Sequence, residues 1–269
     1  MAAGKQLPRQ KERSLGSSLE SLIMASLIND PNGLKRIQFI DTDGRRKTIR
    51  LGKQNDGGYV ICDLSDLSDY DIFLSAGVAN DISFEKEFLD KYKDLVCVAY
   101  DGCIQSLPDT HSRLTHIKKN IGSLDTNSTT TLKDFFKLYN NIFLKMDIEG
   151  AEVDWINCLE DSDLLKIKQL TIEFHSAYKT EPLKRLAKTH WLVHLHPNNC
   201  CGTSVINGVE VPNFFECTYI RKDLYSNLEY NKVSIPCSLD QPNVITMKLH
   251  DGNIYFFPEI HLNHPPFVE

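Results

Sequence analysis

The sequence predicts an α/β domain whose central sheet is mostly parallel and covered by helices on both faces. Two observations predict this class. First, short apolar runs typical of buried strands alternate with segments in which apolar residues recur at helical spacing. Second, these runs are apolar almost throughout, as strands buried on both faces of a parallel sheet are. The length of 269 residues and the apolar content of 41% suffice for one such domain.

The N-terminal part is expected to be added to the core of this domain. Residues 1–16 are basic and poor in apolar side chains, which predicts a flexible tail. Residues 17–66 form the predicted N-terminal extension. Within it we expect, in order, an amphipathic helix, a hairpin and a further short strand, over 18–29, 36–52 and 56–64.

The core is predicted over residues 67–222, in a single domain that runs from 17 to 269. Seven buried strands are expected at 70–77, 95–101, 117–121, 142–148, 169–175, 190–197 and 214–220. Helices are expected at 81–92, 130–139, 150–160 and 181–189. Residues 223–269 hold two more strand-like runs, at 244–249 and 254–257, which form either closing strands or a lid over the substrate.

Composition and charge narrow the class of function. The net charge of −6 argues against a broad electrostatic grip on nucleic acid. No apolar run reaches the roughly 18 residues that a membrane-spanning helix needs. The eight cysteines include no CxxC pair, and several lie in apolar strands, a pattern typical of buried thiols in a reducing compartment. We therefore expect a cytoplasmic protein without a membrane span.

A nucleoside-type ligand is predicted at the ends of the first two core strands. Gly77 allows a tight turn and a close approach of the backbone to a ligand, and Val78 and Asn80 follow it in the same loop. Asp101, followed by Gly102, stands where an acid can accept hydrogen bonds from a ribose diol. A plain turn and a solvated acid are the alternatives. The absence of a GxGxxG fingerprint argues against a nicotinamide-dependent oxidoreductase.

Acidic and imidazole side chains follow or end the fourth, fifth and sixth predicted strands in pairs. These pairs are Asp147 with Glu149, Glu173 with His175, and His194 with His196. Neighbouring strands lie only about 4.8 Å apart, so side chains from adjacent strand ends can converge. Clustered carboxylates repel one another unless they share a cation. A Mn²⁺ or Mg²⁺ ion held by Asp147, Glu173 and His175 would satisfy them.

The same residues have simpler interpretations, which the sequence leaves open. Glu149 can cap the helix that begins near Gly150, and His175 can be a structural hydrogen-bond donor. Glu152 and Asp154 are interpreted as acids of the first helical turn and nothing more.

The segment "HPNNCCG" at 196–202 is a candidate substrate-binding loop. Asn198 and Asn199 supply uncharged donors and acceptors suited to a sugar hydroxyl. The alternative is that both asparagines only shape turns. The adjacent Cys200 and Cys201 are interpreted as loop and core residues rather than a redox pair.

Several motifs together resemble one family. "FLKMDIEGAE" resembles the acidic signature that closes the fourth strand of FkbM-type methyltransferases, "TTLKDFF" resembles the segment before it, and "LTIEFH" the next strand. "GGYVI", "SAGVANDISFE" and "HLHPNNCCGT…VPNFFECTYI" resemble a methyltransferase-like branch of that family. The likeness covers about residues 56–222.

This resemblance implies a Rossmann-like class I methyltransferase fold, S-adenosylmethionine as cofactor, and O-methylation of a hydroxyl on a sugar or natural product. Gly77 then matches the glycine of the cofactor loop, Asp101 the acid that holds the ribose, and Asp147 with Glu149 the acidic motif. The first strand ends "LSAG", where many relatives place an acid before the glycine.

The sequence therefore favours an O-methyltransferase that acts on a small molecule or glycan, with metal assistance as an option. Asp147, His175 and His196 are the predicted catalytic residues, with either histidine as the general base. Glu149, Asn198 and Asn199 are the predicted substrate-binding residues. The alternative is a catalytically inactive module of the same fold that recognises a glycan or a protein partner.

Overall fold

A computed structural model describes residues 30, 33–40, 44–64, 70–175, 181–206, 208–226, 229–248 and 250–268. The predicted tail 1–16, the predicted helix 18–29 and the centre of the predicted hairpin, 41–43, lie outside the described residues.

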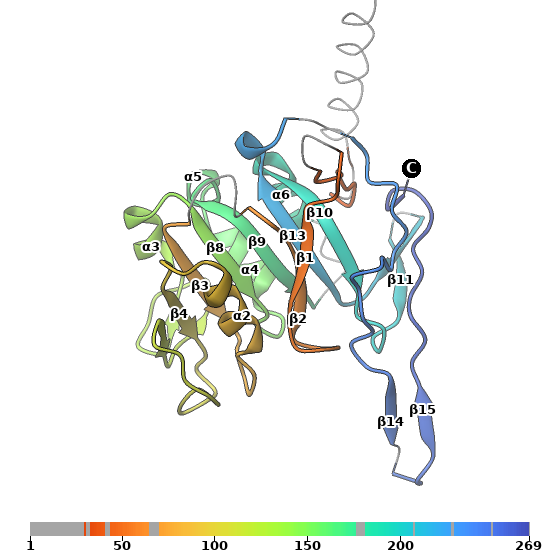
Figure 1. The fold of residues 1–269 in the computed structure, drawn as a ribbon, viewed down its shortest axis with the longest axis horizontal. Coiled ribbons are helices and arrows are strands. Elements are labelled where there is room, and N and C mark those ends of the chain that lie inside the picture. The colour runs from red at the N-terminus through yellow and green to blue at the C-terminus, as the bar shows by residue number, and fades with distance from the viewer. Residues whose placement is uncertain are drawn as a thin grey trace, which may run out of the picture.

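The described part of the chain is built around a seven-stranded sheet (Figure 1). Its strands are β3 (Ile72–Ala76), β4 (Cys97–Tyr100), β5 (Leu114–Ile117), β8 (Ile142–Met146), β9 (Ile167–Phe174), β10 (His190–Pro197) and β13 (Phe215–Arg221). Their order is β10-β13-β9-β8-β3-β4-β5. The strands from β5 to β9 pair in parallel, whereas β13 runs antiparallel between β9 and β10. The predicted mostly parallel sheet of seven strands is confirmed.

Consecutive side chains of a strand point to opposite faces of the sheet, so the apolar strands contribute to a core on each face. Leu74 and Leu144 pack in a core with Trp155 and Leu186. That face carries α3 (Lys133–Leu138), α4 (Glu152–Cys158), α5 (Asp161–Leu164) and α6 (Glu181–Thr189). The predicted helices therefore form and cover this face, although the one expected at 150–160 begins at Glu152 and is followed by the separate α5.

The second face is covered by one helix and one hairpin. Phe73 and Phe143 pack here against Phe84 and Phe88 of α2 (Ser83–Lys91) and against Tyr59. The hairpin consists of β1 (Thr48–Gly52) and β2 (Gly58–Cys62), and β2 lies against β9, β10 and β13. The strand expected at 56–64 is thus the partner of β1. Of the pairing predicted within 36–52, the described residues include a bridge between Ile40 and Arg46.

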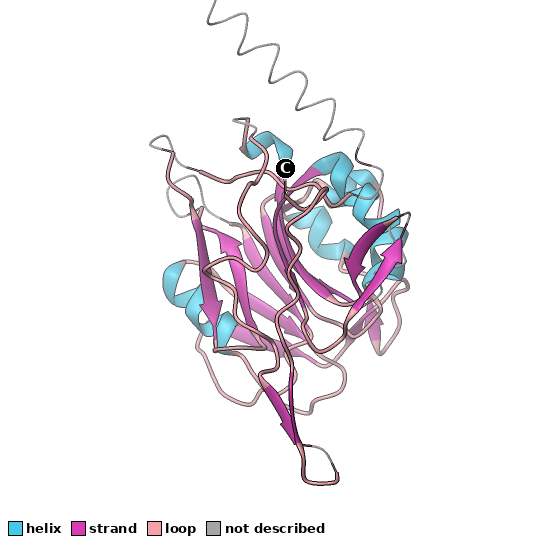
Figure 2. Ribbon diagram, turned by 90° about the vertical axis from the view of Figure 1, so that its right-hand side faces the viewer, coloured by secondary structure: helices cyan, strands magenta, loops and turns pink. Residues whose placement is uncertain are grey.

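The C-terminal strands do not extend the sheet, which corrects one of the two expectations for this region. The strands β14 (Thr246–Lys248) and β15 (Ile254–Phe256) pair only with each other and project from the body as a hairpin (Figure 2). A second hairpin, of β11 (Thr203–Ile206) and β12 (Val209–Pro212), was not predicted. Shorter elements are β6 (Asn120–Ile121), β7 (Thr129–Thr130) and a 3-10 turn at Lys222–Leu224.

All eight cysteines are free thiols, and four of them are buried. Among the described helices, none combines the length and the apolar character that crossing a membrane requires.

Candidate active site

The turn after β3 requires a glycine and joins two strand ends. Gly77 has a φ of +73°, and a Cβ atom there would lie 1.5 Å from the carbonyl oxygen of Asp147. The main chain of Asp147 also donates a hydrogen bond to Ala76 at 3.0 Å. The predicted tight turn is therefore present, and the backbone that it approaches within the protein is that of Asp147.

The buried side chain of Lys145 stabilises this turn. Lys145 lies in β8 and is 5% exposed, and its Nζ donates to the carbonyl oxygen of Gly77 at 2.6 Å. Burial raises the pKa of Glu85, and the positive charge of Lys145 opposes that shift. We did not single out Lys145 from the sequence, although a cation inside the apolar run "IFLKM" was the available signal.

Asp101 ties the end of β4 to the glycine turn. Its two carboxylate oxygens accept backbone hydrogen bonds from Ala79 at 2.9 Å and from Cys103 at 2.8 Å. A carboxylate oxygen can accept more than one hydrogen bond. Asp101 therefore shapes the loop and keeps acceptor capacity for a hydroxyl.

A pocket of about 450 Å³ opens where β3, β4 and β8 end. Gly77, Asp101 and Glu149 line it, together with Tyr100 and Asn120. Its volume falls in the range of roughly 300–1,000 Å³ that is usual for small-molecule sites. The pocket therefore stands at the edge where open α/β sheets bind ligands.

The other predicted cofactor-binding residues, Val78, Asn80 and Gly102, do not line this pocket but lie next to it. Gly102 donates its N–H to the side chain of Asn120 at 2.8 Å. Val78 is buried in a small apolar cluster, and both Val78 and Asn80 line an adjoining pocket of about 80 Å³. Asp147 borders both pockets.

A larger hollow of about 690 Å³ lies at the opposite edge of the sheet. Its lining includes Lys166, Arg221 and Lys222. Arg221 and Lys222 donate to backbone carbonyls, and Lys166 donates to the side chain of Asn140, so these cations serve the fold. Because ligands of such sheets bind at the carboxyl ends of the strands, we place the site at the 450 Å³ pocket.

Several acidic side chains gather near Asp147 at the carboxyl ends of the strands, and we call this region the acidic edge. His175 lies among these acids. The Nε2 atom of His175 lies 3.7 Å from Asp147 Oδ1 and 3.4 Å from Glu149 Oε2. Asp147, Glu149 and His175 each offer one ligand atom, all within 4.8 Å of one another. The structure thus brings together three of the predicted residues, with Glu149 in the position that we had assigned to Glu173.

Glu152 fixes the orientation of this histidine. It is 0% exposed, and its Oε1 lies 2.9 Å from His175 Nδ1 and accepts from the backbone N–H groups of Ile148 and Gly150. The interpretation of Glu152 as a mere helix-start acid was wrong, because the packing of α4 turns it inward. Asp154 on the same helix is exposed, as expected.

The electrostatic state of His175 follows from these neighbours. Burial by itself lowers the pKa of His175, but the hydrogen bond and charge of Glu152 and the charges of Glu173 and Asp147 raise it to about 9. A protonated imidazole is therefore the cation that these carboxylates share in the protein as described.

Glu173 lies on β9, directly opposite Glu216 of β13. Its Oε1 accepts a hydrogen bond from Asn198 Nδ2 at 3.0 Å. Burial, followed by the negative charges of Asp147 and Glu216, raises the pKa of Glu173 to about 8. Asn198, a predicted substrate-binding residue, therefore contacts the acidic edge through Glu173.

Tyr59 is a site residue that the sequence analysis missed. Its hydroxyl donates to Asp147 Oδ2 at 3.0 Å, and its ring is 2% exposed. Burial raises the pKa of Tyr59 well above its ordinary value, so the phenol remains a donor. Nothing in the sequence around Tyr59, in the segment "GGYVI", predicted this contact, because the contact depends on β2 packing across the sheet.

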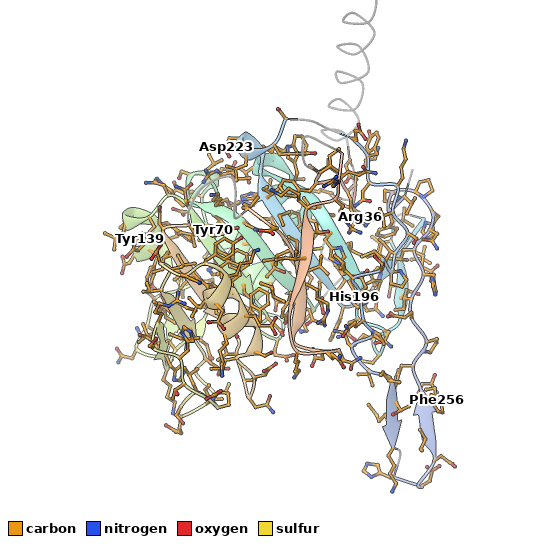
Figure 3. All side chains as sticks on the ribbon, in the orientation of Figure 1. Arg36, Tyr70, Tyr139, His196, Asp223 and Phe256 are labelled. Carbon is orange, nitrogen blue, oxygen red and sulfur yellow. The ribbon has the colours of Figure 1, made fainter. Side chains whose placement is uncertain are left out.

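His196 and Asn199 do not join this group. His196 (labelled in Figure 3) lies between Glu216 at 3.8 Å and Glu259 at 3.6 Å, because β13 separates β10 from β9. Asn199 Nδ2 donates to the carbonyl oxygens of Val244 and Phe257 and so holds the base of the β14–β15 hairpin.

Comparison with known families agrees with this geometry. The family model of the methyltransferase FkbM domain matches residues 48–195, which is more than half of the chain. The chain belongs to this family. It is therefore a methyltransferase that uses S-adenosylmethionine, and its sheet is that of the Rossmann-like class I methyltransferase fold.

The solved structures to which this FkbM-family methyltransferase was compared resemble it only distantly. No curated protein matches it. The plantazolicin methyltransferase BpumL in complex with SAH is 8% identical and has a TM-score of 0.29, with 59% of this chain and 78% of that chain covered. A mutant 16S rRNA (adenine(1408)-N(1))-methyltransferase from Catenulisporales acidiphilia is 10% identical, at 0.28, with 66% and 99% covered.

The pocket of the methyltransferase suits the cofactor of its family. Gly77 leaves its rim without a side chain, and Asp101 stands at the end of β4, where such folds hold a ribose. Ser75 and Ala76 stand where many relatives have an acid before Gly77, and Lys145 donates a hydrogen bond to the carbonyl oxygen of Gly77.

Proposed function

We propose that this methyltransferase transfers a methyl group to a hydroxyl of a small-molecule acceptor, a sugar or glycan, whose reacting oxygen meets Asp147. One observation carries the proposal. Asp147 borders the cofactor pocket, and its buried Oδ1 atom has no hydrogen-bond partner among the described residues, while Oδ2 is held by Tyr59. A buried acceptor without a partner is costly, so a ligand group is expected there.

The residues of the site can perform the proton chemistry of such a transfer. Bound S-adenosylmethionine supplies a methyl group on a sulfonium, and the acceptor oxygen needs alignment and loss of its proton. Asp147 Oδ1 accepts that proton, Tyr59 keeps the carboxylate in place, and the charge of His175 compensates the neighbouring acids. Asp101 and Gly77 hold the cofactor on the other side of Asp147.

The chemistry of the edge favours a polyhydroxyl acceptor. Glu173 and Asn198, with Asp56 nearby, present hydrogen-bonding groups rather than an apolar wall. Hydroxyl groups can add hydrogen bonds to the remaining acceptor capacity of these carboxylates, whereas an apolar acceptor cannot, and a phosphate-rich one would be repelled. We infer that sugar hydroxyls are the groups that satisfy them.

A divalent cation can take the place of the proton on His175. Asp147, Glu149 and His175 would hold Mn²⁺ or Mg²⁺, with Glu152 fixing the imidazole as carboxylates do for metal-bound histidines. Such an ion would lower the pKa of an acceptor hydroxyl bound to it. Glu173, which we first assigned to the metal, then acts as a neighbour whose carboxyl is held by Asn198.

The test combines cofactor binding with methyl transfer. Calorimetry with S-adenosylmethionine, before and after chelation and with added Mn²⁺, measures binding and its metal dependence. Transfer of labelled methyl groups to free sugars and oligosaccharides measures activity, with nucleotide sugars as the acceptors expected to react poorly. Asp147→Asn is expected to bind the cofactor without turnover, and Asp154→Asn, on the same helix-start segment but exposed, to be fully active.

Two outcomes would contradict the proposal. Unchanged turnover by Asp147→Asn would remove Asp147 from the reaction. If neither the native protein nor the metal-loaded protein binds the cofactor, the result would favour an inactive binding module. Binding to glycan arrays would then test that alternative.

A further inference from the structure

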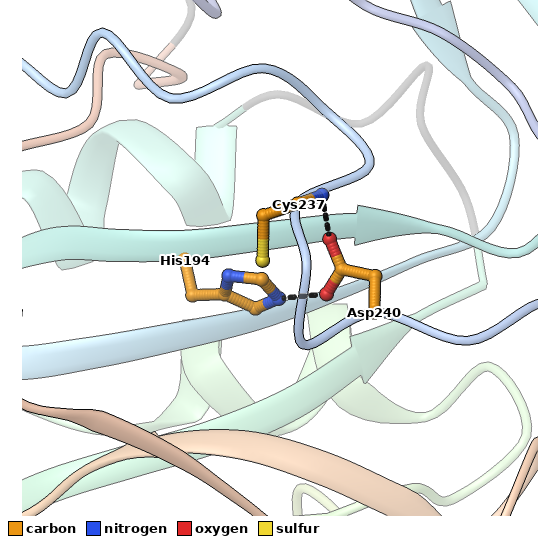
Figure 4. Close-up of side chains that lie close together, drawn as sticks. All are labelled: His194, Cys237 and Asp240. Atoms are coloured by element: carbon orange, nitrogen blue, oxygen red, sulfur yellow. Dashed lines mark hydrogen bonds and ion pairs between the residues drawn. The ribbon is translucent and has the colours of Figure 1, made fainter.

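A second group of potential metal ligands lies away from the cofactor pocket. His194 lies on β10, and Cys237 and Asp240 lie in the C-terminal segment that packs against this strand (Figure 4). One ligand atom from each residue lies within 4.8 Å of the other two. The strand β13 separates β10 from β9, the strand that leads to His175, so this group is distinct from the acidic edge.

Local backbone structure presents these three side chains to one point. The pairing of β10 with β13 shifts register between Leu192 and His194. Cys237 and Asp240 form a tight turn, in which Asp240 N donates to Cys237 O at 3.1 Å and Cys237 N donates to Asp240 Oδ2 at 2.6 Å. The second oxygen, Oδ1, is left to face His194 Nε2 at 2.9 Å.

The facing polar atoms are buried, and the contact between them is an ion pair of His194 with Asp240. The side chains of His194 and Asp240 are 2% and 1% exposed, and Cys237 is 8% exposed. Within the described residues, Nδ1 of His194 has no hydrogen-bond partner, and its Nε2 has no neighbour of opposite charge other than Asp240 Oδ1, at 2.9 Å. A cation shared by the three facing ligand atoms would satisfy all of them at once.

We propose that His194, Cys237 and Asp240 bind one zinc ion that fastens the C-terminal segment to β10. An imidazole nitrogen, a thiolate and a carboxylate are the usual zinc ligands, whereas Mg²⁺ and Mn²⁺ disfavour a thiolate. Zinc lies about 2.0–2.3 Å from such ligands, so small side-chain movements would bring the three atoms to it, and one water would be the fourth ligand of a tetrahedral set.

Charge and position support a structural role for this ion. The Asp240 carboxylate and the Cys237 thiolate together neutralise a zinc ion. The positive charge of Arg36 lies close enough to act on Asp240 and Cys237, and it would repel the zinc ion. The Arg36 guanidinium is itself held in place by the carbonyl oxygens of Val233 and Phe267, to which it donates hydrogen bonds. Because the ligands are buried and come from two segments far apart in sequence, the ion would cross-link them rather than face a substrate.

The metal content of the full chain tests this proposal. We expect one zinc ion per chain by mass spectrometry after purification without added metal or after reconstitution and dialysis. Cys237→Ala and His194→Gln are expected to lose it. Cys62→Ala, which removes a buried thiol elsewhere, and Asp147→Asn, which alters the acidic edge, are expected to retain it.

A second measurement applies if the zinc-site variants fail to fold. Cobalt substitution of the unmodified chain is expected to give an intense near-ultraviolet thiolate band and visible bands of a tetrahedral site, and chelation is expected to lower the melting temperature. A folded protein that takes up neither zinc nor cobalt would overturn the proposal and leave a buried His194–Asp240 ion pair. Zinc retained by both Cys237→Ala and His194→Gln would overturn it as well.

Discussion

His175 is oriented by Glu152, whose Oε1 lies 2.9 Å from its Nδ1, so that its Nε2 faces Asp147 and Glu149. We predict that Glu152→Gln keeps the shape of this contact but removes its charge. The pKa of His175 should fall from about 9 towards its ordinary value, since burial lowers it and the hydrogen bond and charge of Glu152 do most to raise it. The free energy of unfolding should fall by about 1.5–3 kcal/mol, the usual worth of a hydrogen bond to a charged group.

An NMR pH titration of the His175 ring and denaturant unfolding measure these two effects. Asp154→Asn is the matched control, because it removes an exposed acid from the same helix. A His175 that titrates normally in both proteins would show that Glu152 does not set its charge.

The same pKa predicts how stability depends on pH. The folded-state pKa of His175, about 9, is above its ordinary value of 6.5, so its stabilising contribution is complete below pH 6.5. That contribution is lost as the pH rises through 9. Unfolding free energies of the native protein across this window should therefore decline, and the decline should be smaller in Glu152→Gln.

Glu173 provides a separate pH effect in an adjoining range. Its folded-state pKa of about 8 lies above the ordinary 4.5, so the folded protein binds the extra proton and stability falls as the pH rises from 4.5 to 8. Glu173→Gln should be more stable than the native protein at pH 8 and show little difference at pH 4.5. Melting curves at the two pH values decide this, and equal effects at both would contradict it.

The strands and helices of the core could be predicted because their signals are local. Apolar runs and helical spacing locate β3, β8 and α2 within a few residues. The order of strands depends on contacts between distant segments, which no local pattern encodes. The insertion of β13 between β9 and β10 therefore went unpredicted, and with it the separation of His196 from His175.

The candidate site shows the same limit. The proximity of Asp147 and His175 could be predicted from sequence because they follow β8 and β9, which are parallel neighbours, although the predicted third ligand was Glu173 and not Glu149. Glu152 and Tyr59 could not, since one depends on how α4 packs and the other on a hairpin that crosses the sheet. For β14 and β15 the strand pattern was correct, but pattern alone does not say which edge a strand pairs with.

Gly77 should tolerate no side chain. Gly77→Ala would place a Cβ atom 1.5 Å from the carbonyl oxygen of Asp147 at a left-handed φ of +73°. The turn must then open, which should abolish S-adenosylmethionine binding and cost more than about 2 kcal/mol of unfolding free energy. Calorimetry and denaturant unfolding measure both. Gly122→Ala is the control, because its Cβ would meet only ordinary contacts at 3.6 Å, and it should bind the cofactor normally.

The neighbouring Asn198 and Asn199 should differ in function although sequence treats them alike. Asn199 holds the base of the β14–β15 hairpin through Val244 and Phe257, so Asn199→Ala should speed hydrogen exchange of the hairpin amides and leave methyl transfer unchanged. Asn198 instead donates to Glu173, so Asn198→Ala should lower turnover at the acidic edge and leave exchange in the hairpin unchanged. Exchange mass spectrometry and the transfer assay on both variants separate the two roles. A loss of turnover in Asn199→Ala that equals the loss in Asn198→Ala would instead support the original expectation that both asparagines bind the acceptor.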